Sequence, residues 1–218
     1  MSPTTLYAVV GTLFALAALA NWWAVVVRNY RVMVVAKPLT LIALIGIALI
    51  GGAGDETAGR WLLLGLVLCL AGDVFLLGDG EKAFLAGLSS FLLGHIAYVA
   101  TFVVLGLAEP AWGLIGVMTL IAAAPWIVRV VPAAHRDGGV GLAGAVTAYT
   151  LVIGAMVVLA WMTGHWLIGL GATTFMVSDT VLAVNRFVER RRLGDLAVMV
   201  TYHLGQLLIV LGVLSALP

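Results

Sequence analysis

The sequence has few charged residues and no long hydrophilic segment. Of its 218 residues, 10% are charged and 63% are hydrophobic, and the mean hydropathy is +1.18. Soluble domains contain about 25% charged and about 45–50% apolar residues. The composition therefore excludes a soluble globular domain and a disordered chain. The net charge of +1 also argues against a nucleic acid as partner.

Several familiar catalytic motifs are missing as well. The sequence has no Gly-x-Ser-x-Gly elbow, no His-Glu-x-x-His zinc motif and no phosphate-binding P-loop. The one cysteine, Cys69, lies in an apolar run and cannot form a disulfide within the chain. His95 and His203 do not have the spacing of a metal site, so we expect no metal and no cofactor. The N-terminus has no basic region, so we expect the first apolar run to be a retained span.

What the sequence does contain is a series of long apolar runs separated by short charged or turn-forming segments. A membrane-spanning helix needs roughly 20 apolar residues. Strands of a membrane barrel would instead alternate apolar and polar residues over about 10 positions, whereas these runs are continuous. We predict an all-α, polytopic membrane bundle that forms a single integral membrane domain over residues 1–218. The eight predicted spans cover residues 5–27, 32–51, 60–78, 83–107, 111–131, 141–163, 165–185 and 195–216.

The basic residues lie almost entirely on one side of this predicted topology. Lysine and arginine favour cytoplasmic loops, so this side is predicted to be cytoplasmic and both termini to face outward from a cell (inner) membrane. Only Arg60 falls on the other side. The residues on the basic side are Arg28, Arg31, Lys37, Lys82, Arg129, Arg136, Arg186, Arg190, Arg191 and Arg192.

A weak internal repeat links the two halves of the chain. The third predicted span contains Asp73 and the seventh contains Asp179, each within the pattern small-Asp-x-x-Leu. The span after each aspartate carries a histidine, His95 or His203. The pattern suggests two parallel four-helix halves, residues 1–108 and 109–218, related by an axis along the membrane normal.

Asp73 and Asp179 are the only acidic residues in the interior of the predicted spans, because Asp195 stands at the very start of the last one. A charge at the centre of a membrane helix costs on the order of 2.5–3.5 kcal/mol, so such residues face a cavity, pair with another group or perform chemistry. At about 1.5 Å per residue, other polar residues fall at a similar depth, roughly 7–18 Å below the cytoplasmic ends. We therefore predict one polar cavity in the cytoplasmic half. The residues at this depth include Lys37, His95, Tyr149, Tyr202, His203 and Gln206, with Tyr98 three residues after His95.

Each of these residues also has a purely structural interpretation. Asp73 could pair with Lys37 as an intramembrane salt bridge, and Lys37-Pro38 could mark the start of a helix. The two histidines could be core residues bonded to a backbone carbonyl or a tyrosine. The tyrosines are more often packing groups than catalysts. The 26 glycines allow close helix packing within one chain or in a homo-oligomer.

Taken together, the polar segments resemble the YhhN family of lysoplasmalogenase-like membrane proteins. They occur in family order across nearly the whole chain, although His203 stands where the family often has tyrosine. The resemblance implies eight spans and hydrolysis of the vinyl ether of lysoplasmalogens. The matching segments begin at Lys37-Pro38-Leu39-Thr40, Gly72-Asp73-Val74, Gly94-His95-Ile96-Ala97-Tyr98, Ala148-Tyr149-Thr150, Ser178-Asp179-Thr180 (continuing to Asn185-Arg186-Phe187) and Thr201-Tyr202-His203 (continuing to Gln206).

The chemistry implied by the resemblance calls for two carboxyl groups. A proton must reach the alkene carbon and water must add to the resulting cation, as glycosidases achieve with one carboxylic acid and one carboxylate. Asp73 and Asp179 are the buried pair available as catalysts, and which is the acid stays open. Lys37 suits a substrate phosphate. The expected substrate is a lysophospholipid or a related amphiphile. The other candidate binding residues are His95, Tyr98, Tyr149, Asn185, Tyr202, His203 and Gln206.

Two other function classes also fit an intramembrane pair of aspartates. A proton-coupled transporter of lipids or small molecules would also contain repeats with buried Asp and His, but it needs access from both sides. Here the polar residues gather in one half, which favours a one-sided pocket. A non-catalytic lipid-binding protein would tolerate alanine at both aspartates.

Overall fold

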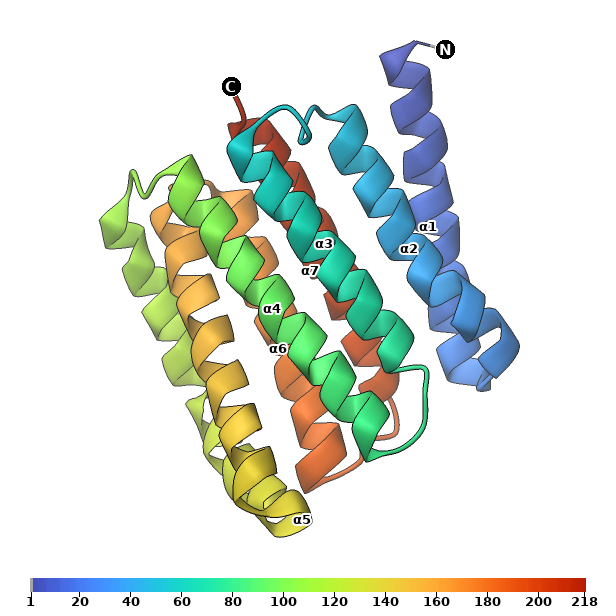
Figure 1. The fold of residues 1–218 in the computed structure, drawn as a ribbon, viewed down its shortest axis with the longest axis vertical. Coiled ribbons are helices and arrows are strands. Elements are labelled where there is room, and N and C mark those ends of the chain that lie inside the picture. Colours follow the sequence, from blue (N-terminus) through green and yellow to red (C-terminus); the bar gives the residue numbers. More distant parts are fainter. Residues whose placement is uncertain (1) are drawn as a thin grey trace.

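The structure is a computed structural model that describes residues 2–218, and these residues form a bundle of helices joined by short turns (Figure 1). No strand occurs in this part of the chain, so the predicted all-α class is confirmed. The elements are α1 (Pro3–Val27), α2 (Tyr30–Ile50), α3 (Thr57–Phe75), α4 (Glu81–Leu105), the 3-10 turn η1 (Pro110–Trp112), α5 (Gly113–Met162), α6 (Trp166–Ala183), the π-helical turn η2 (Val184–Val188) and α7 (Gly194–Ala216).

The helices have the length and composition of membrane spans. Seven helical segments within residues 2–218 are long and apolar enough to cross a membrane. Large apolar side chains cover their outer surfaces, including Leu16, Leu19, Val35 and Leu151, each more than half exposed. A water-soluble bundle would place polar residues at such positions. The outer surface therefore fits a hydrocarbon environment, where helices satisfy their own backbone hydrogen bonds.

Helix α5 differs from the prediction of separate spans at 111–131 and 141–163. Pro132 was expected to end the first of these, but Pro125 and Pro132 both lie within the helix. Membrane helices tolerate proline because neighbouring groups can satisfy the freed backbone carbonyls. The helical conformation is instead interrupted at Gly138 and Gly139, and Gly139 has a φ of 67°. This left-handed value carries no steric penalty for glycine.

The chain reverses direction at this glycine pair, so that α5 is a hairpin with two helical arms (Figure 1). The arms lie very close together. A Cβ atom added at Gly116 in the first arm would lie 2.8 Å from Cα of Val158 in the second. The amide of Glu109, just before the first arm, donates to the carbonyl of Met162 at the end of the second (3.0 Å). Helix α5 therefore contains two antiparallel helical segments.

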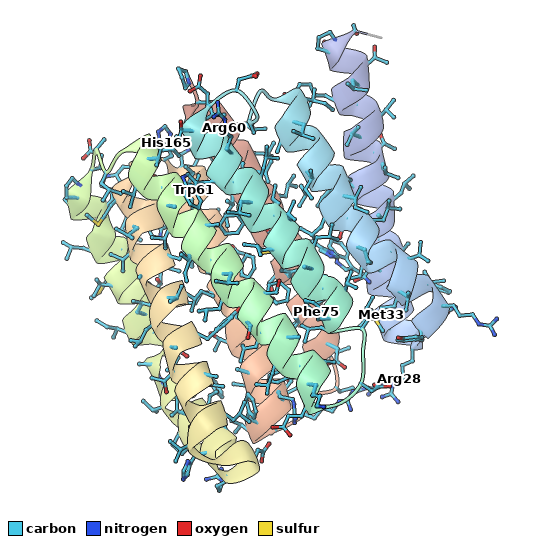
Figure 2. All side chains as sticks on the ribbon, in the orientation of Figure 1. Arg28, Met33, Arg60, Trp61, Phe75 and His165 are labelled. Atoms are coloured by element: carbon cyan, nitrogen blue, oxygen red, sulfur yellow. The ribbon has the colours of Figure 1, made fainter. Side chains whose placement is uncertain are left out.

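One end of the bundle carries most of the basic residues, and we call it the basic end. It is formed by the α1–α2 turn at Arg28, the loop 76–80, the α5 bend and the loop 189–193 (Figure 1). Figure 2 shows Arg28 at this end, whereas Arg60 and His165 lie at the other. Helix α1 begins and α7 ends at that opposite end (Figure 1). The two ends of the bundle therefore differ in charge as the sequence predicted.

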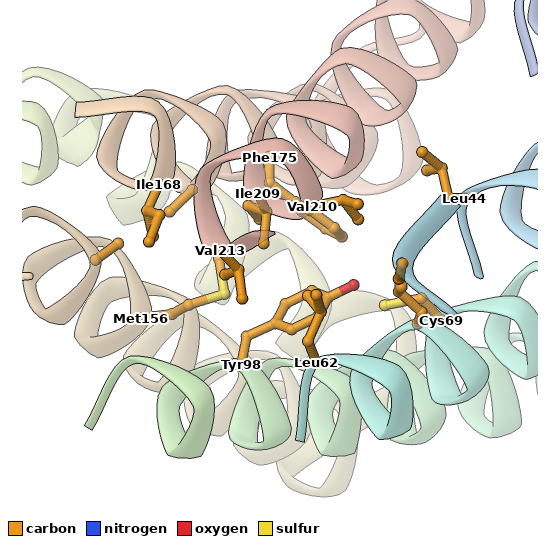
Figure 3. Close-up of a cluster of buried hydrophobic side chains, with 14 of the residues drawn as sticks. Leu44, Leu62, Cys69, Tyr98, Met156, Ile168, Phe175, Ile209, Val210 and Val213 are labelled. Carbon is orange, nitrogen blue, oxygen red and sulfur yellow. The ribbon is translucent and has the colours of Figure 1, made fainter. Parts of the chain in front are cut away.

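The interior is a continuous apolar core contributed by all seven helices. Figure 3 shows Leu62, Phe175, Ile209 and Val213 converging around Tyr98, and all five side chains are fully buried. In Figure 1 the pair α3 and α4 lies in front of the pair α6 and α7, and the core fills the space between the helices. The polar side chains described below lie within this packed framework, which limits their freedom to move.

Glycines bring α6 and α7 into backbone contact, and a methyl group there is expected to be costly. A Cβ atom at Gly205 would lie 2.8 Å from the amide nitrogen of Phe175. We expect Gly205→Ala to lower the free energy of unfolding by about 1–3 kcal/mol because the backbones must separate. Thermal unfolding in detergent would measure this loss. Gly144→Ala is the control, because a Cβ atom at Gly144 has no neighbour within 4 Å; equal stability of both variants would contradict the expectation.

Candidate functional site

A cavity of about 640 Å³ lies between α4, the two arms of α5, α6 and η2. Most of its wall consists of aliphatic and aromatic side chains. Its polar wall residues are few: Tyr149, Thr150, Asp179, Thr180 and Arg186. Ligand pockets of about 300–1,000 Å³ with apolar walls and a few placed polar groups are typical of small-molecule sites. The cavity therefore suits an amphiphile better than a polar metabolite.

Asp179 is placed in the cavity wall by α6, one turn before that helix ends. The Tyr149 hydroxyl, from the second arm of α5, donates to its Oδ2 atom in a short hydrogen bond. His95 Nε2, from α4, lies 3.7 Å from the same oxygen. The Oδ1 atom has no hydrogen-bond partner among residues 2–218, and the side chain is 14% exposed. One carboxylate oxygen is therefore held by the protein and the other is available to the cavity.

His95 supports Asp179 from the interior side. Its side chain is fully buried and is not part of the cavity wall. The imidazole packs edge-on against the ring of Tyr149, with a centroid separation of 5.2 Å, and against Phe175 at 4.7 Å. These contacts fix the ring behind both Asp179 and Tyr149. His95 thus contacts these two groups from the interior of the bundle, and neither of its ring nitrogens has a hydrogen-bond partner among residues 2–218.

Asp73 occupies a different environment from Asp179, although the sequence places them at similar depth. Lys37 Nζ lies 3.1 Å from its Oδ1 atom, and the Tyr202 hydroxyl donates to its Oδ2 atom at 2.8 Å. Both charged side chains are buried, and Lys37 does not reach the end of the bundle. Asp73 is not part of the cavity wall. The structural interpretation of Lys37, an intramembrane ion pair with Asp73, is therefore the arrangement found.

The two aspartates are connected by a chain of packed rings rather than by direct contact. Tyr202, which bonds Asp73, meets Phe175 edge-on at 5.3 Å between centroids. Phe175 in turn packs against His95 beside Asp179. The ring contacts therefore link the surroundings of the ion pair to those of Asp179.

The remaining buried candidates form hydrogen bonds within the bundle. The Tyr98 hydroxyl donates to Gln206 Oε1 at 2.6 Å. The Trp22 indole donates to His203 Nδ1 at 3.0 Å, which leaves the proton on Nε2, 3.2 Å from the Thr40 hydroxyl. His203 thus fastens α7 to α1 and α2 as a neutral imidazole. None of these residues belongs to the cavity wall.

Asn185, which was predicted as a binding residue, is not part of the cavity wall. It belongs to the π-helical turn η2, and its Oδ1 atom accepts a hydrogen bond from the Arg191 amide at 3.4 Å. Its side chain lies so close to Gly194 that any Cβ atom there would clash. Asn185 therefore stabilises the loop between α6 and α7.

Arg186 is a residue of the site that was not predicted from the sequence. The structure places it in the cavity wall beside Phe84 and Phe187. A signal was available, because Arg186 follows Asp179 by seven residues, close to two helical turns, which puts both on one helix face.

Among residues 2–218, no group of three or more His, Cys, Asp and Glu side chains has an arrangement that could hold a metal ion.

Known proteins that are similar to this chain carry the name lysoplasmalogenase. The sequence pattern of the YhhN family matches residues 30–213. The pig protein named lysoplasmalogenase TMEM86B is 33% identical over 178 residues, covering 81% of this chain and 73% of that protein. The human protein of the same name is 32% identical over 197 residues, covering 90% and 77%. A protein of Mycobacterium bovis named lysoplasmalogenase is 29% identical, covering 70% and 60%.

No solved structure matches the chain, so the sequence comparisons carry the assignment. The family pattern covers most of the residues from α2 to α7, including every residue of the cavity wall and both buried aspartates. The chain therefore belongs to the YhhN family.

Proposed function

We propose that this protein is an integral membrane hydrolase that cleaves the vinyl ether bond of lysoplasmalogen-type lysophospholipids. The products would be a fatty aldehyde and a glycerophospho-headgroup. The observation that carries the proposal is Asp179, which is the one carboxyl group in the wall of the apolar cavity among residues 2–218. The names of the relatives supply the substrate class.

The cavity provides separate surroundings for the two halves of such a lipid. Apolar side chains from four helical segments, among them Phe91, Leu120, Val146 and Met176, would surround the alkenyl chain. The hydroxyl and carboxyl groups of Tyr149 and Asp179 would lie beside the ether. Burial of the chain excludes bulk water and strengthens the electrostatic interactions of the reacting groups.

The first chemical step would be proton transfer from a protonated Asp179 to the alkene carbon remote from the ether oxygen. This step breaks the carbon–carbon π bond and leaves a cation shared between the other alkene carbon and the ether oxygen. Water then adds to the cationic carbon while the Asp179 carboxylate accepts a proton from it. The resulting hemiacetal collapses to the aldehyde and the glycerol hydroxyl. One carboxyl group would thus act first as acid and then as base.

The other buried residues would support this carboxyl group. Tyr149 holds Oδ2 of Asp179 and leaves Oδ1 to face the substrate. His95 positions both side chains. Asp73, paired with Lys37, would remain ionised, and its negative charge would favour a cation formed elsewhere in the low-dielectric interior. Of the two aspartates predicted as catalytic, Asp179 would thus transfer the protons, and Asp73 would act through its charge.

The topology proposed for this enzyme has eight membrane crossings, because each arm of α5 would cross separately. The basic end would face the cytoplasm of a cell (inner) membrane, and the cavity that contains Asp179 would open toward that side. The helix pairs α3–α4 and α6–α7 are the candidates for a duplicated unit. Both pairs carry the aspartate on the first helix and close glycine contacts between the two helices.

The direct test is release of fatty aldehyde from lysoplasmenyl-ethanolamine by the purified protein in detergent. The saturated 1-O-alkyl analogue is the control, because it has an ether but no alkene to protonate. We expect aldehyde from the vinyl ether alone. A folded protein that releases none from any lysoplasmalogen would overturn the proposed hydrolase and favour the transporter alternative.

A further inference from the structure

Arg186 is an unusual residue for the wall of an apolar membrane cavity. It lies in η2, the five-residue π-helical turn that follows α6 at the basic end. Its guanidinium stands over the ring of Phe84, 5.3 Å from the centroid, and over Phe187 at 5.4 Å. The same side chain lines the cavity that contains Asp179. Single π-helical turns within helices often occur at functional sites.

The guanidinium of Arg186 has few acidic or hydrogen-bonding partners among the described residues. Its nearest acid is Asp137, with 3.9 Å between Nη1 and Oδ2, and both side chains are about half exposed. That separation is too long for a hydrogen bond, and the guanidinium donates none to residues 2–218. An arginine has five N–H donors in a planar fork that matches the oxygens of a phosphate. The two phenyl rings hold this fork in place and leave its donors unused.

The position of Arg186 relative to Asp179 fits the layout of a lysolipid. The seven residues between them correspond to about 10 Å along the helix, with Arg186 nearer the basic end. Side chains on a helix lean toward its N-terminus, so the arginine side chain leans back toward Asp179. In a lysoplasmalogen, the three glycerol carbons separate the phosphate from the vinyl ether. The lipid could therefore place its ether near Asp179 and its phosphate near Arg186.

We propose that Arg186 binds the headgroup phosphate of the lysolipid and so sets the depth at which the vinyl ether meets Asp179. This assignment rests on the proposed function for the identity of the lipid. The sequence suggested Lys37 as the phosphate-binding residue. Because Lys37 forms an ion pair with Asp73, this role is now proposed for Arg186. Arg186 thereby selects lipids that carry both a chain and a phosphate.

The test measures binding separately from catalysis. The probe is the non-cleavable 1-O-alkyl glycerophosphoethanolamine, and its partner is the 1-O-alkyl glycerol with the same chain but no phosphate. Each affinity is expressed as the mole fraction of lipid in the micelle, so that the different partitioning of the two lipids into detergent does not enter the ratio of affinities. We expect the wild-type protein to prefer the phospholipid by about tenfold to a hundredfold, as for hydrogen bonds to charged groups.

Three variants separate a phosphate site from a general effect of charge. Arg186→Gln should lose most of that preference, and Arg186→Lys should keep part of it because lysine retains the charge but not the planar fork. Arg190→Gln is the matched control. Arg190 lies at the same end, is more exposed and pairs with Asp195 at 3.2 Å, outside the cavity wall. Its variant should keep the wild-type preference.

Each outcome decides the proposal. An undiminished preference in Arg186→Gln, or no preference in the wild-type protein, would overturn it. Competition by tail-free glycerophosphoethanolamine at concentrations comparable to the lipid would mean that a soluble phosphate compound is the ligand, and would overturn the lipid assignment. Because the probe is not cleaved, loss of binding in Arg186→Gln would stand even if no aldehyde were ever released, whereas aldehyde release tests only the hydrolase.

Discussion

Asp179→Asn is expected to abolish release of aldehyde from lysoplasmenyl-ethanolamine, with a fall in rate of about a hundredfold to ten-thousandfold. Asparagine has the shape of aspartate and can still accept a hydrogen bond from Tyr149, but it cannot deliver a proton to the alkene carbon. The cavity wall has no second carboxyl group among the described residues that could replace it. The measurement is the turnover rate of purified protein at saturating lipid.

The control for this variant is Asp195→Asn, which removes a carboxyl group from an exposed site at the same end of the bundle. We expect its rate to equal that of the wild-type protein. Thermal unfolding of all three proteins shows whether Asp179→Asn is folded. A folded Asp179→Asn protein with the wild-type rate would remove Asp179 from the mechanism and leave the cavity without an acid.

The polar layer was predictable from the sequence because depth along a helix follows directly from residue number. Asp73, Tyr202, His95 and Asp179 fall at similar depths on separate spans, and the structure brings them into one connected set of contacts. The number of residues from a loop gives a position along the membrane normal at about 1.5 Å per residue. It gives nothing about which neighbour each side chain meets.

That missing information explains why the sequence left open which of the two aspartates is the acid. Their short sequence patterns are the same, yet Asp73 meets Lys37 and Asp179 meets Tyr149. The difference depends on how α3 and α6 are rotated and on which helices lie beside them. These features are set by packing of small residues such as Gly205 against neighbouring backbones, and no local pattern records them.

The interruption of α5 at 138–139 falls between the two predicted spans, but the helix before it is longer than predicted. Pro132 is a strong helix breaker in soluble proteins, so the predicted span ended at residue 131, whereas the helix continues to the glycine pair. Arg186 was read as one of several basic residues near a loop, a group that normally reports topology alone. Arg186 differs from the other basic residues in its two phenyl neighbours, Phe84 and Phe187. Phe84 belongs to a different helix, so only the tertiary structure shows that it contacts Arg186.

Lys37→Met is expected to lower the free energy of unfolding by about 3–5 kcal/mol, the typical cost of leaving one partner of a buried ion pair without the other. The Asp73 carboxylate would keep the hydrogen bond from Tyr202 but lose its countercharge in an apolar interior. Unfolding of the purified variant in a denaturing detergent series measures the loss. Arg31→Met, at an exposed position near the start of the same helix, is the control and should unfold like the wild-type protein.

The double variant Lys37→Met with Asp73→Asn separates stability from catalysis. It buries no charge and keeps an acceptor for Tyr202, so most of the lost stability should return. If the Asp73 charge favours the cation formed beside Asp179, the double variant should be folded but slower than the wild-type protein, and still faster than Asp179→Asn. If the double variant is as unstable as Lys37→Met, the unpaired Asp73 charge is not the cause of the stability lost in Lys37→Met. A stable double variant with the full wild-type rate would confine Asp73 to a structural role, and Asp179 would then carry both proton transfers without help from a second charge.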